Sequence, residues 1–202
     1  MVTSPNAGEG KSTTSVALAI NFAQLGMSVL LIDGDLRNPS AHQLLRCPAE
    51  NGLTNYLVGS ASAGAMMQGT DVPQLCFMAS GPLPPNPAEL LAGQNMVRLL
   101  SSAGEKFDIV IIDAPPVLGL ADAPLLASMG AGTLLVLGAG ETRRGVVKAA
   151  LKRLHFARAQ MVGVVLNKFD MRAANYAYHS YGALQYYGYG TQSLAKTDAN
   201  QI

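Results

Sequence analysis

Short continuous runs of apolar residues alternate along this chain with longer segments in which apolar residues recur every three or four positions. We expect strands at the continuous runs, which are residues 28–32, 74–79, 107–112, 133–137 and 161–166. We expect helices where the spacing is three or four, over residues 12–25, 87–103, 121–128 and 142–158. Because strands that are apolar throughout are covered on both faces, the alternation predicts an α/β fold with a doubly wound, mostly parallel sheet.

The alternation weakens in two places. A long polar stretch after the first of these runs contains only short helical candidates, at residues 41–45 and 53–58. After Asp170 the periodicity ends, and Tyr, Ala, Gly and Asn dominate the rest of the chain. We therefore expect a folded domain over residues 1–170 and a flexible, tyrosine-rich tail over residues 171–202.

Composition narrows the range of functions. The chain has 202 residues, of which 49% are hydrophobic and 13% are charged, and its formal net charge is +1. This balance gives no reason to expect a nucleic-acid partner, and no apolar run approaches the ~18 residues that cross a bilayer. Cys47 and Cys76 lack the spacing of a metal site, so we expect free thiols in a reducing cytoplasm.

A glycine-rich loop lies near the start of the chain and leads into the first predicted helix. Gly8 and Gly10 let the backbone curl so that its N–H groups face phosphate oxygens, and the helix start adds positive potential. We expect Lys11 to reach the β- and γ-phosphates and the Ser12 hydroxyl to bind Mg²⁺. The residues predicted to bind ATP here are Gly8, Glu9, Gly10, Lys11, Ser12 and Thr13.

Carboxylates follow two of the predicted strands. Asp33 and Asp35 come directly after one apolar run, and Asp113 comes directly after another. Because the carboxyl ends of parallel strands lie at one edge of a sheet, we expect these aspartates to converge with Lys11. Their mutual repulsion requires a compensating cation, so we predict that Ser12, Asp33 and Asp113 hold Mg²⁺.

Six of the seven tyrosines fall within a short stretch near the C-terminus. A nucleotide site at one end of a chain and a run of phenol hydroxyls at the other suggest a phosphoryl donor and its acceptors. The predicted phosphoacceptors are Tyr176, Tyr178, Tyr181, Tyr186, Tyr187 and Tyr189.

Together these segments resemble one family. The residues 3–12 TSPNAGEGKS, 33–37 DGDLR, 113–116 DAPP and 81–91 GPLPPNPAELL, with the tyrosine-rich tail, resemble the bacterial tyrosine kinases of capsular and exopolysaccharide export. The first three segments resemble that family's Walker A, Walker A′ and Walker B motifs. The resemblance implies a deviant-Walker P-loop NTPase fold, related to the partition ATPases, and covers nearly the whole chain.

The resemblance also implies an activity. It implies ATP and Mg²⁺ as cofactors and autophosphorylation of the tail, usually between subunits of a homo-oligomeric ring. It implies a membrane polysaccharide copolymerase as partner, fused or separate, and a cytoplasmic place at the inner face of the bacterial plasma membrane. It further suggests that Asn167 contacts adenine, although a capping or turn role for this asparagine remains open.

Phosphoryl transfer to a phenol needs positioning and charge neutralisation more than covalent help. We predict catalytic roles for Lys11, Asp33, Asp35 and Asp113. A carboxylate near the phenol accepts its proton, and Asp33 is the first candidate and Asp35 the second.

The start of the chain departs from the family pattern. Only Met1, Val2 and Thr3 precede the loop, where a full central strand is expected. Either this strand is shortened or the chain is a fragment of a longer polypeptide. Because a missing central strand would leave two open edges inside the sheet, we expect the fragment. Members of the family usually carry an upstream segment with a glutamate- and arginine-containing oligomerisation motif, which this sequence lacks, so we expect ring assembly to depend on restoring it.

Two other functions remain open. A positioning ATPase of the partition or cell-division type shares the predicted fold, but such proteins carry a lysine where Ser4, Pro5 and Asn6 stand. A non-catalytic ATP-binding regulator would bind nucleotide without forming phosphotyrosine. The basic residues Arg144 and Lys148, with Lys152 one turn further on, form either a solvated helix face or a docking surface.

Overall fold

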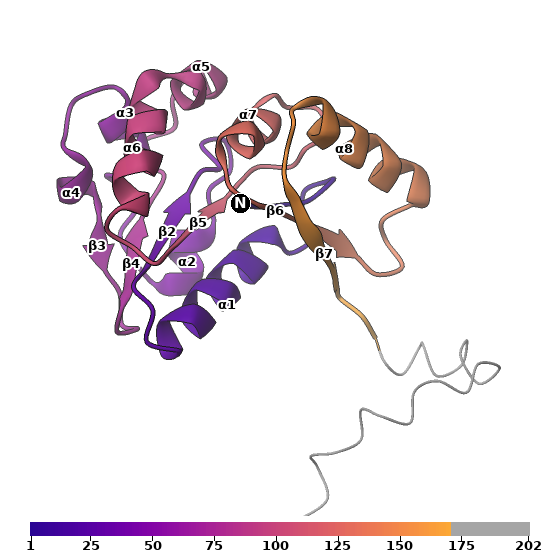
Figure 1. Ribbon diagram of the computed structural model, residues 1–202, viewed down its shortest axis with the longest axis horizontal. Helices are drawn as coiled ribbons and strands as arrows, with labels where there is room; N and C mark the ends of the chain where they lie inside the picture. The colour runs from indigo at the N-terminus through magenta and orange to yellow at the C-terminus, as the bar shows by residue number, and fades with distance from the viewer. Residues whose placement is uncertain (171–202) are drawn as a thin grey trace, which may run out of the picture. The chain divides into compact units, whose positions relative to one another are not determined.

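Figure 1 shows a computed structural model of the chain, which describes residues 1–170. A seven-stranded sheet runs in the order β3-β4-β2-β5-β1-β6-β7, and every neighbouring pair is parallel except β3 with β4. The strands are β1 (Val2–Thr3), β2 (Val29–Asp33), β3 (Gln68–Gly69), β4 (Leu75–Met78), β5 (Ile109–Asp113), β6 (Thr133–Gly138) and β7 (Met161–Asn167). The predicted doubly wound, mostly parallel α/β sheet is confirmed.

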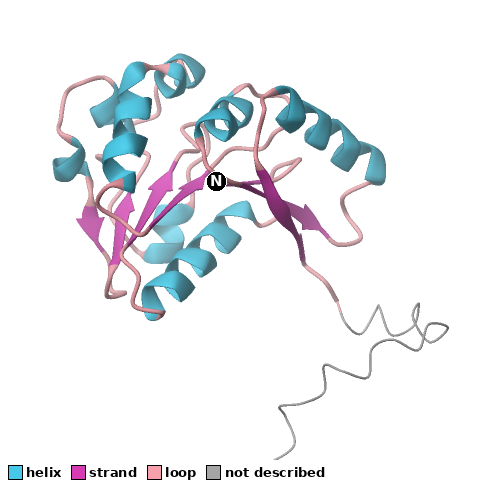
Figure 2. Cartoon of the chain, in the orientation of Figure 1, coloured by secondary structure: helices cyan, strands magenta, loops and turns pink. Residues whose placement is uncertain are grey.

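Helices cover both faces of the sheet, as the cartoon in Figure 2 shows. They are α1 (Lys11–Gln24), α2 (Ala41–Leu45), α3 (Leu53–Leu57), α4 (Ala63–Met66), α5 (Pro87–Ala92), α6 (Gln94–Gly104), α7 (Asp122–Met129) and α8 (Arg144–Phe156). Helices α1 and α2 pack on one face, where Val29 and Leu31 of β2 point. Helices α3, α5, α6 and α7 cover the other face, where Leu30 and Ile32 point. Both faces of β2 are thus buried, as its apolar run predicts.

The short first strand occupies the centre of the sheet. Val2 pairs with Asp113 of β5 on one side and with Leu134 of β6 on the other. Its two residues are therefore enough to bridge the two halves of the sheet within the described part of the chain. This placement puts the glycine-rich loop directly after a central strand, at the carboxyl edge.

One predicted helix is divided. Residues 87–103 were expected to form a single helix, but α5 ends at Ala92 and α6 begins at Gln94. Gly93 between them has ψ 159°, an extended value that interrupts the helical hydrogen bonds. Helix α4 and strand β3 were not predicted, because elements of four and two residues are too short to show a period.

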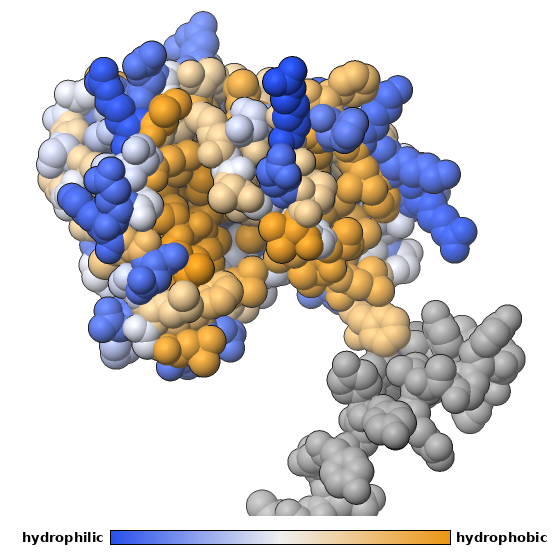
Figure 3. Space-filling view, viewed as in Figure 1, coloured by the Kyte–Doolittle hydropathy of each residue, from blue (hydrophilic) through white to orange (hydrophobic). Residues whose placement is uncertain are grey.

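Strand β7 differs from the other strands in its exposure. It lies at the edge of the sheet, and Val162, Val164 and Leu166 are 73%, 52% and 55% exposed. Figure 3 shows apolar surface on the side of the molecule where β7 lies. Within residues 1–170, no helix is both long enough and apolar enough to cross a membrane.

Candidate nucleotide and phosphoryl-transfer site

The glycine-rich loop joins β1 to α1 and presents its backbone at the start of that helix. Gly8 and Gly10 have φ values of 81° and 96°, a region that glycine enters without steric cost. Gly10 is the N-cap of the 14-residue α1, and no side chain among residues 1–170 caps the start of this helix. These unpaired amides, together with the helix dipole, favour an anionic ligand. The position of Gly8, Gly10 and Lys11 is therefore the one that phosphate binding requires.

Lys11 lies buried at this edge of the sheet. Its Nζ is 2.9 Å from Asp35 Oδ2 and donates to the Ser12 hydroxyl at 3.3 Å. Burial alone would lower the pKa of Lys11, but the charges of Asp113 and Asp35 outweigh that effect and raise it. The lysine is therefore held as a cation between carboxylates.

Asp33 and Asp113 stand side by side at the ends of β2 and β5, where they are register partners. Both side chains are fully buried. Burial, followed by the charge of Asp113, raises the pKa of Asp33 from 3.8 to about 7. Asp33 still accepts hydrogen bonds from the backbone N–H groups of Asp35 and Ala41, at 3.3 Å and 3.1 Å. Its carboxyl group is thus poised to exchange a proton near neutral pH.

Asp113 has one oxygen with a partner and one without. Its Oδ1 accepts from the Ser15 hydroxyl at 3.0 Å, whereas Oδ2 is buried and lacks a hydrogen-bond partner among the described residues. Burial raises the pKa of Asp113, although Lys11 opposes the shift. A buried carboxylate oxygen without a donor is an energetic cost unless a ligand satisfies it.

These residues fit Mg²⁺ bound together with a nucleotide. Ser12 supplies a hydroxyl, which accepts from Ser40 at 2.9 Å, and Asp113 supplies the free oxygen. Within residues 1–170, no three Asp, Glu, His or Cys side chains are arranged to hold a metal by themselves. Mg²⁺ characteristically takes one or two protein oxygens and completes its shell with water and phosphate. The roles predicted for Ser12, Asp33 and Asp113 as metal ligands stay predictions.

A cavity opens beside the loop. It has a volume of about 500 Å³. It is lined by Ala7, Gly8, Gly10, Lys11, Ser12, Thr13, Asp35, Arg37, Asn38, Ser40, Pro116 and Leu120. Lys11, Asp35 and Pro116 on its wall belong to three of the four segments that the sequence singled out, namely residues 3–12, 33–37 and 113–116. The other two predicted carboxylates, Asp33 and Asp113, do not line this cavity, but their charges act on Lys11, which does.

Glu9 and Asn167 occupy places that the sequence did not anticipate. The Asn167 amide nitrogen donates to the Glu9 carbonyl at 3.0 Å, and so this side chain contacts the loop backbone. The Glu9 carboxylate is turned away from the cavity lining and accepts from Thr142 at 2.5 Å. An adenine contact by Asn167 therefore stays a prediction that would use its remaining oxygen.

Four residues near the site were missed in the sequence analysis. Arg37 forms a bidentate ion pair with the buried Asp122: its Nε lies 2.7 Å from Oδ2 and its Nη2 lies 3.2 Å from Oδ1. This pair connects the segment after β2 to the start of α7. Ser40 contacts Ser12, and Thr142 contacts Glu9. Arg37 stands inside the DGDLR segment and could have been singled out there. Asp122, Ser40 and Thr142 carried no signal, because their contacts join positions far apart in the chain.

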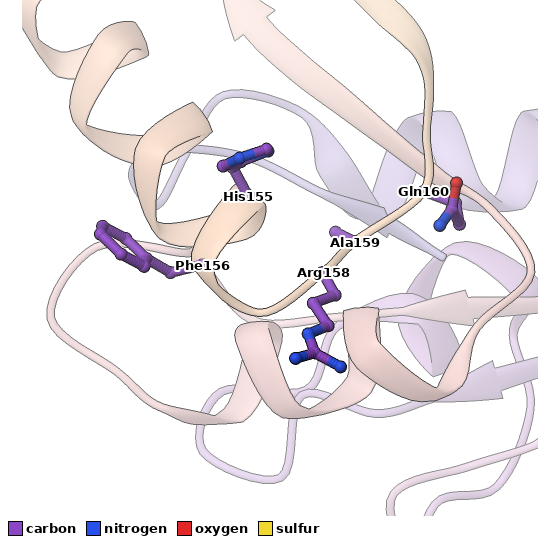
Figure 4. Close-up of a pocket in the computed structure, with 5 residues that line it drawn as sticks. All are labelled: His155, Phe156, Arg158, Ala159 and Gln160. Atoms are coloured by element: carbon purple, nitrogen blue, oxygen red, sulfur yellow. The ribbon is translucent and has the colours of Figure 1, made fainter.

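A second depression, of about 650 Å³, lies at the end of α8. Figure 4 shows the side chains of His155, Phe156, Arg158 and Gln160 pointing in different directions around it. Nothing converges there, so the depression does not form a second chemical site. The six predicted phosphoacceptor tyrosines lie outside the described residues.

Known proteins that resemble this chain in sequence are bacterial tyrosine-protein kinases. Residues 2–136 match the family model described as an AAA domain. Tyrosine-protein kinase YwqD of Bacillus subtilis is 39% identical over 180 residues, which cover 89% of this chain and 76% of that protein. EpsB of Ralstonia solanacearum is 37% identical over 197 residues, which cover 97% of this chain but 26% of the longer protein.

Solved structures agree in fold. The kinase domain of Escherichia coli tyrosine kinase ETK superposes with a TM-score of 0.80 at 34% identity, covering 83% of this chain and 66% of that one. The septum site-determining protein MinD of Pyrococcus horikoshii, complexed with Mg-ADP, superposes with a TM-score of 0.71 at 21% identity, covering 86% of this chain and 74% of that one. At that identity the second likeness concerns the fold alone.

Proposed function

Since this chain belongs to the family of bacterial tyrosine-protein kinases, as its motifs predict, we propose that it transfers the γ-phosphoryl group of ATP to its own C-terminal tyrosines. The acceptors are the six tyrosines between positions 176 and 189. The observation that supports this proposal best is the convergence of Lys11, Asp33, Asp35 and Asp113 beside the phosphate loop. Positive and negative groups meet there at the edge of the sheet where α/β proteins bind ligands.

Each group has a distinct task in the proposed reaction. Lys11 and the loop amides neutralise charge on the phosphate oxygens, and Ser12 and Asp113 hold Mg²⁺ directly or through water. The phenol oxygen attacks the γ-phosphorus, and the bond to the bridging oxygen breaks to release ADP. Asp33 takes the phenol proton, because a carboxylate whose pKa is about 7 is a better base than an ordinary one. Asp35 instead pairs with Lys11.

The biological setting follows from the family. We place the chain at the cytoplasmic face of the bacterial plasma membrane, associated with a membrane polysaccharide copolymerase. This chain corresponds to only 26% of the length of EpsB, and we propose that the partner is fused to the kinase in such longer relatives. Phosphorylation there regulates capsular or exopolysaccharide polymerisation and export. Ring assembly would let the tail of one subunit reach the site of its neighbour.

The test is incubation of the purified chain with Mg²⁺ and ATP, followed by mass spectrometry of the peptide spanning residues 175–190. We expect phosphate on tyrosines within that peptide, and none in the Lys11→Met variant. Nucleotide binding is measured on the same samples by calorimetry with ADP.

Two outcomes would redirect the proposal. Binding of ADP without any phosphotyrosine, even after an upstream segment from a relative is fused to the chain, identifies a non-catalytic regulator. ATP hydrolysis without phosphotyrosine points to a positioning ATPase. Asn6, Pro5 and Ser4 argue against the latter, since none supplies the lysine that such ATPases place there.

A further inference from the structure

A carboxylate lies buried inside the phosphate loop. Glu9 is only 4% exposed, although it belongs to a segment whose proposed ligand is anionic. Its Oε2 accepts from the backbone N–H of Asn6 at 2.8 Å. Its Oε1 accepts from the Thr142 hydroxyl at 2.5 Å and from the Asn6 amide at 3.4 Å. Each oxygen of this carboxylate therefore has a hydrogen-bond donor.

The charge of Glu9 would oppose phosphate binding if its side chain faced the cavity. Glu9 does not line that cavity, whereas Gly8 and Gly10 on either side of it do. The carboxylate instead points to the back of the loop, toward the turn that follows β6. Its position suggests that it serves the shape of the loop and makes no contact with the ligand.

The partner hydroxyl is itself fixed. Thr142 accepts a hydrogen bond from the Gly138 N–H at 3.0 Å, so its proton is available for Glu9. Thr142 lies two residues before the start of α8, and Gly138 ends β6. The loop is fastened on the same side by the Asn167 amide, which donates to the Glu9 carbonyl at 3.0 Å. Two separate strand ends thus hold one residue of the phosphate loop.

We propose that Glu9 is a positioning residue for the nucleotide site, and that its carboxylate fixes the loop through Asn6 and Thr142. This inference rests on the proposed nucleotide site and deepens it. A loop held in its binding conformation loses less conformational freedom when nucleotide binds. Without the carboxylate, the amides around Gly8 and Gly10 would need to be ordered by the ligand itself. Affinity for nucleotide should then fall while the folded protein persists.

Glu9→Gln tests the carboxylate with almost no change of shape. The NH₂ group of the new amide must face either the Asn6 N–H or the Thr142 hydroxyl. Facing Asn6 it places two donors against each other, and facing Thr142 it removes the acceptor of the hydroxyl proton. We expect the dissociation constant for Mg²⁺-ADP, measured by calorimetry, to rise about tenfold. At saturating ATP the turnover rate should stay within about threefold of the unmodified chain, so that the loss lies in KM.

Glu141→Gln is the matched control. This glutamate adjoins Thr142, but its side chain is 56% exposed and pairs with Lys168 at 2.8 Å. The same chemical change there should leave the ADP dissociation constant within about twofold. If Glu141→Gln weakened ADP binding as much as Glu9→Gln does, removal of any negative charge near the loop would explain both effects, and the proposal would be wrong.

Thr142 provides a second and independent test. Thr142→Val removes the hydroxyl and should weaken ADP binding about three- to tenfold, whereas Thr142→Ser keeps it and should restore binding to within about twofold. Combined with Glu9→Gln, Thr142→Val should add almost nothing, because both break one contact. Should Glu9→Gln not fold, the comparison of valine with serine at position 142 decides the matter.

The outcomes separate the two levels of inference. If the unmodified chain fails to bind ADP, the proposed nucleotide site is wrong and the inference on Glu9 falls with it. If the unmodified chain binds ADP and Glu9→Gln binds it equally well, the role of Glu9 is wrong and the proposed function stands.

Discussion

The two sides of the phosphate loop hold their carboxylates in opposite ways. On the side of Lys11, which lines the cavity, Asp113 has a buried oxygen that lacks a partner among the described residues, and its charge helps to raise the pKa of Asp33 to about 7. On the back, both oxygens of Glu9 accept hydrogen bonds from Asn6 or Thr142. Glu9 and Asp113 are both buried, so the difference between these two carboxylates lies in their hydrogen-bond partners.

The contrast distinguishes a carboxylate that a bound ligand would satisfy from one that stabilises the conformation of the loop. A buried carboxylate with unmet hydrogen bonds raises the free energy of the folded protein, and a bound cation or nucleotide can recover that loss. A buried carboxylate with every bond made stabilises one loop conformation. Substitutions on the cavity side should therefore affect chemistry most, and those on the back should affect affinity.

Lys11→Met should produce the largest effect. Methionine keeps the length of the side chain but removes the cation that lies 2.9 Å from Asp35. Removing one charged group that stabilises a transition state typically lowers the rate by about 10²- to 10³-fold. We expect phosphotyrosine formation, followed by mass spectrometry over time, to fall by at least about 10²-fold. Retention of even a tenth of the original rate would exclude the role given to Lys11.

The fold could be predicted from the sequence because its signals are local. The apolar run that forms β2 and the glycine-rich start of α1 each specify an element within a few residues. Gly93 illustrates the limit, because apolar residues recur with helical spacing on both sides of it while the backbone itself is extended there. The spacing of apolar residues indicates which face of a helix is buried, but it does not indicate where the helix ends.

The site was predictable only in part, for a related reason. Lys11, Asp33 and Asp113 stand at strand or helix ends, and parallel topology alone brings them to one edge. The Glu9 to Thr142 contact joins residues 133 positions apart, and no pattern in the chain marks it. The direction in which the Asn167 amide points depends likewise on the packing of β7 beside the loop.

Gly10→Ala should have the next largest effect, because it acts on both sides of the loop at once. A β-carbon at Gly10 would lie 1.9 Å from the Asn167 amide nitrogen, and the φ of 96° is itself unfavourable for alanine. Asn167 would have to release the Glu9 carbonyl. We expect ADP affinity to fall about thirtyfold or more in calorimetry. Gly8→Ala separates the clash with Asn167 from the cost of a positive φ in this loop, since a β-carbon there meets no atom of residues 1–170 within 4 Å.

Stability against pH gives a smaller effect that is specific to the cavity side. The folded-state pKa of Asp33 is about 7, above its ordinary value of 3.8, so the folded protein binds this proton more tightly than the unfolded chain does. The contribution of Asp33 is therefore fully present below about pH 4 and is lost as pH rises through about 7. One such group changes the unfolding free energy by at most ~1.4 kcal/mol per pH unit.

The measurement is urea unfolding between pH 5 and 8 without Mg²⁺ or nucleotide. The unmodified chain should lose stability over this range more steeply than Asp33→Asn, which cannot release a proton there. Equal slopes for the two proteins would show that Asp33 titrates normally and is not the proposed base.

Lys168→Met should have the smallest effect and completes the comparison of the two sides. Lys168 Nζ lies 2.8 Å from Glu141, almost the distance that joins Lys11 to Asp35, but the two side chains are 41% and 56% exposed. Exposed pairs of this kind contribute at most about 1 kcal/mol and often nothing measurable, because water screens the attraction and the side chains lose freedom. We expect Lys168→Met to leave the urea midpoint, the ADP dissociation constant and the rate of phosphorylation unchanged within error. If Lys168→Met lowered the rate of phosphorylation nearly as much as Lys11→Met, burial beside the loop would not be what makes Lys11 important.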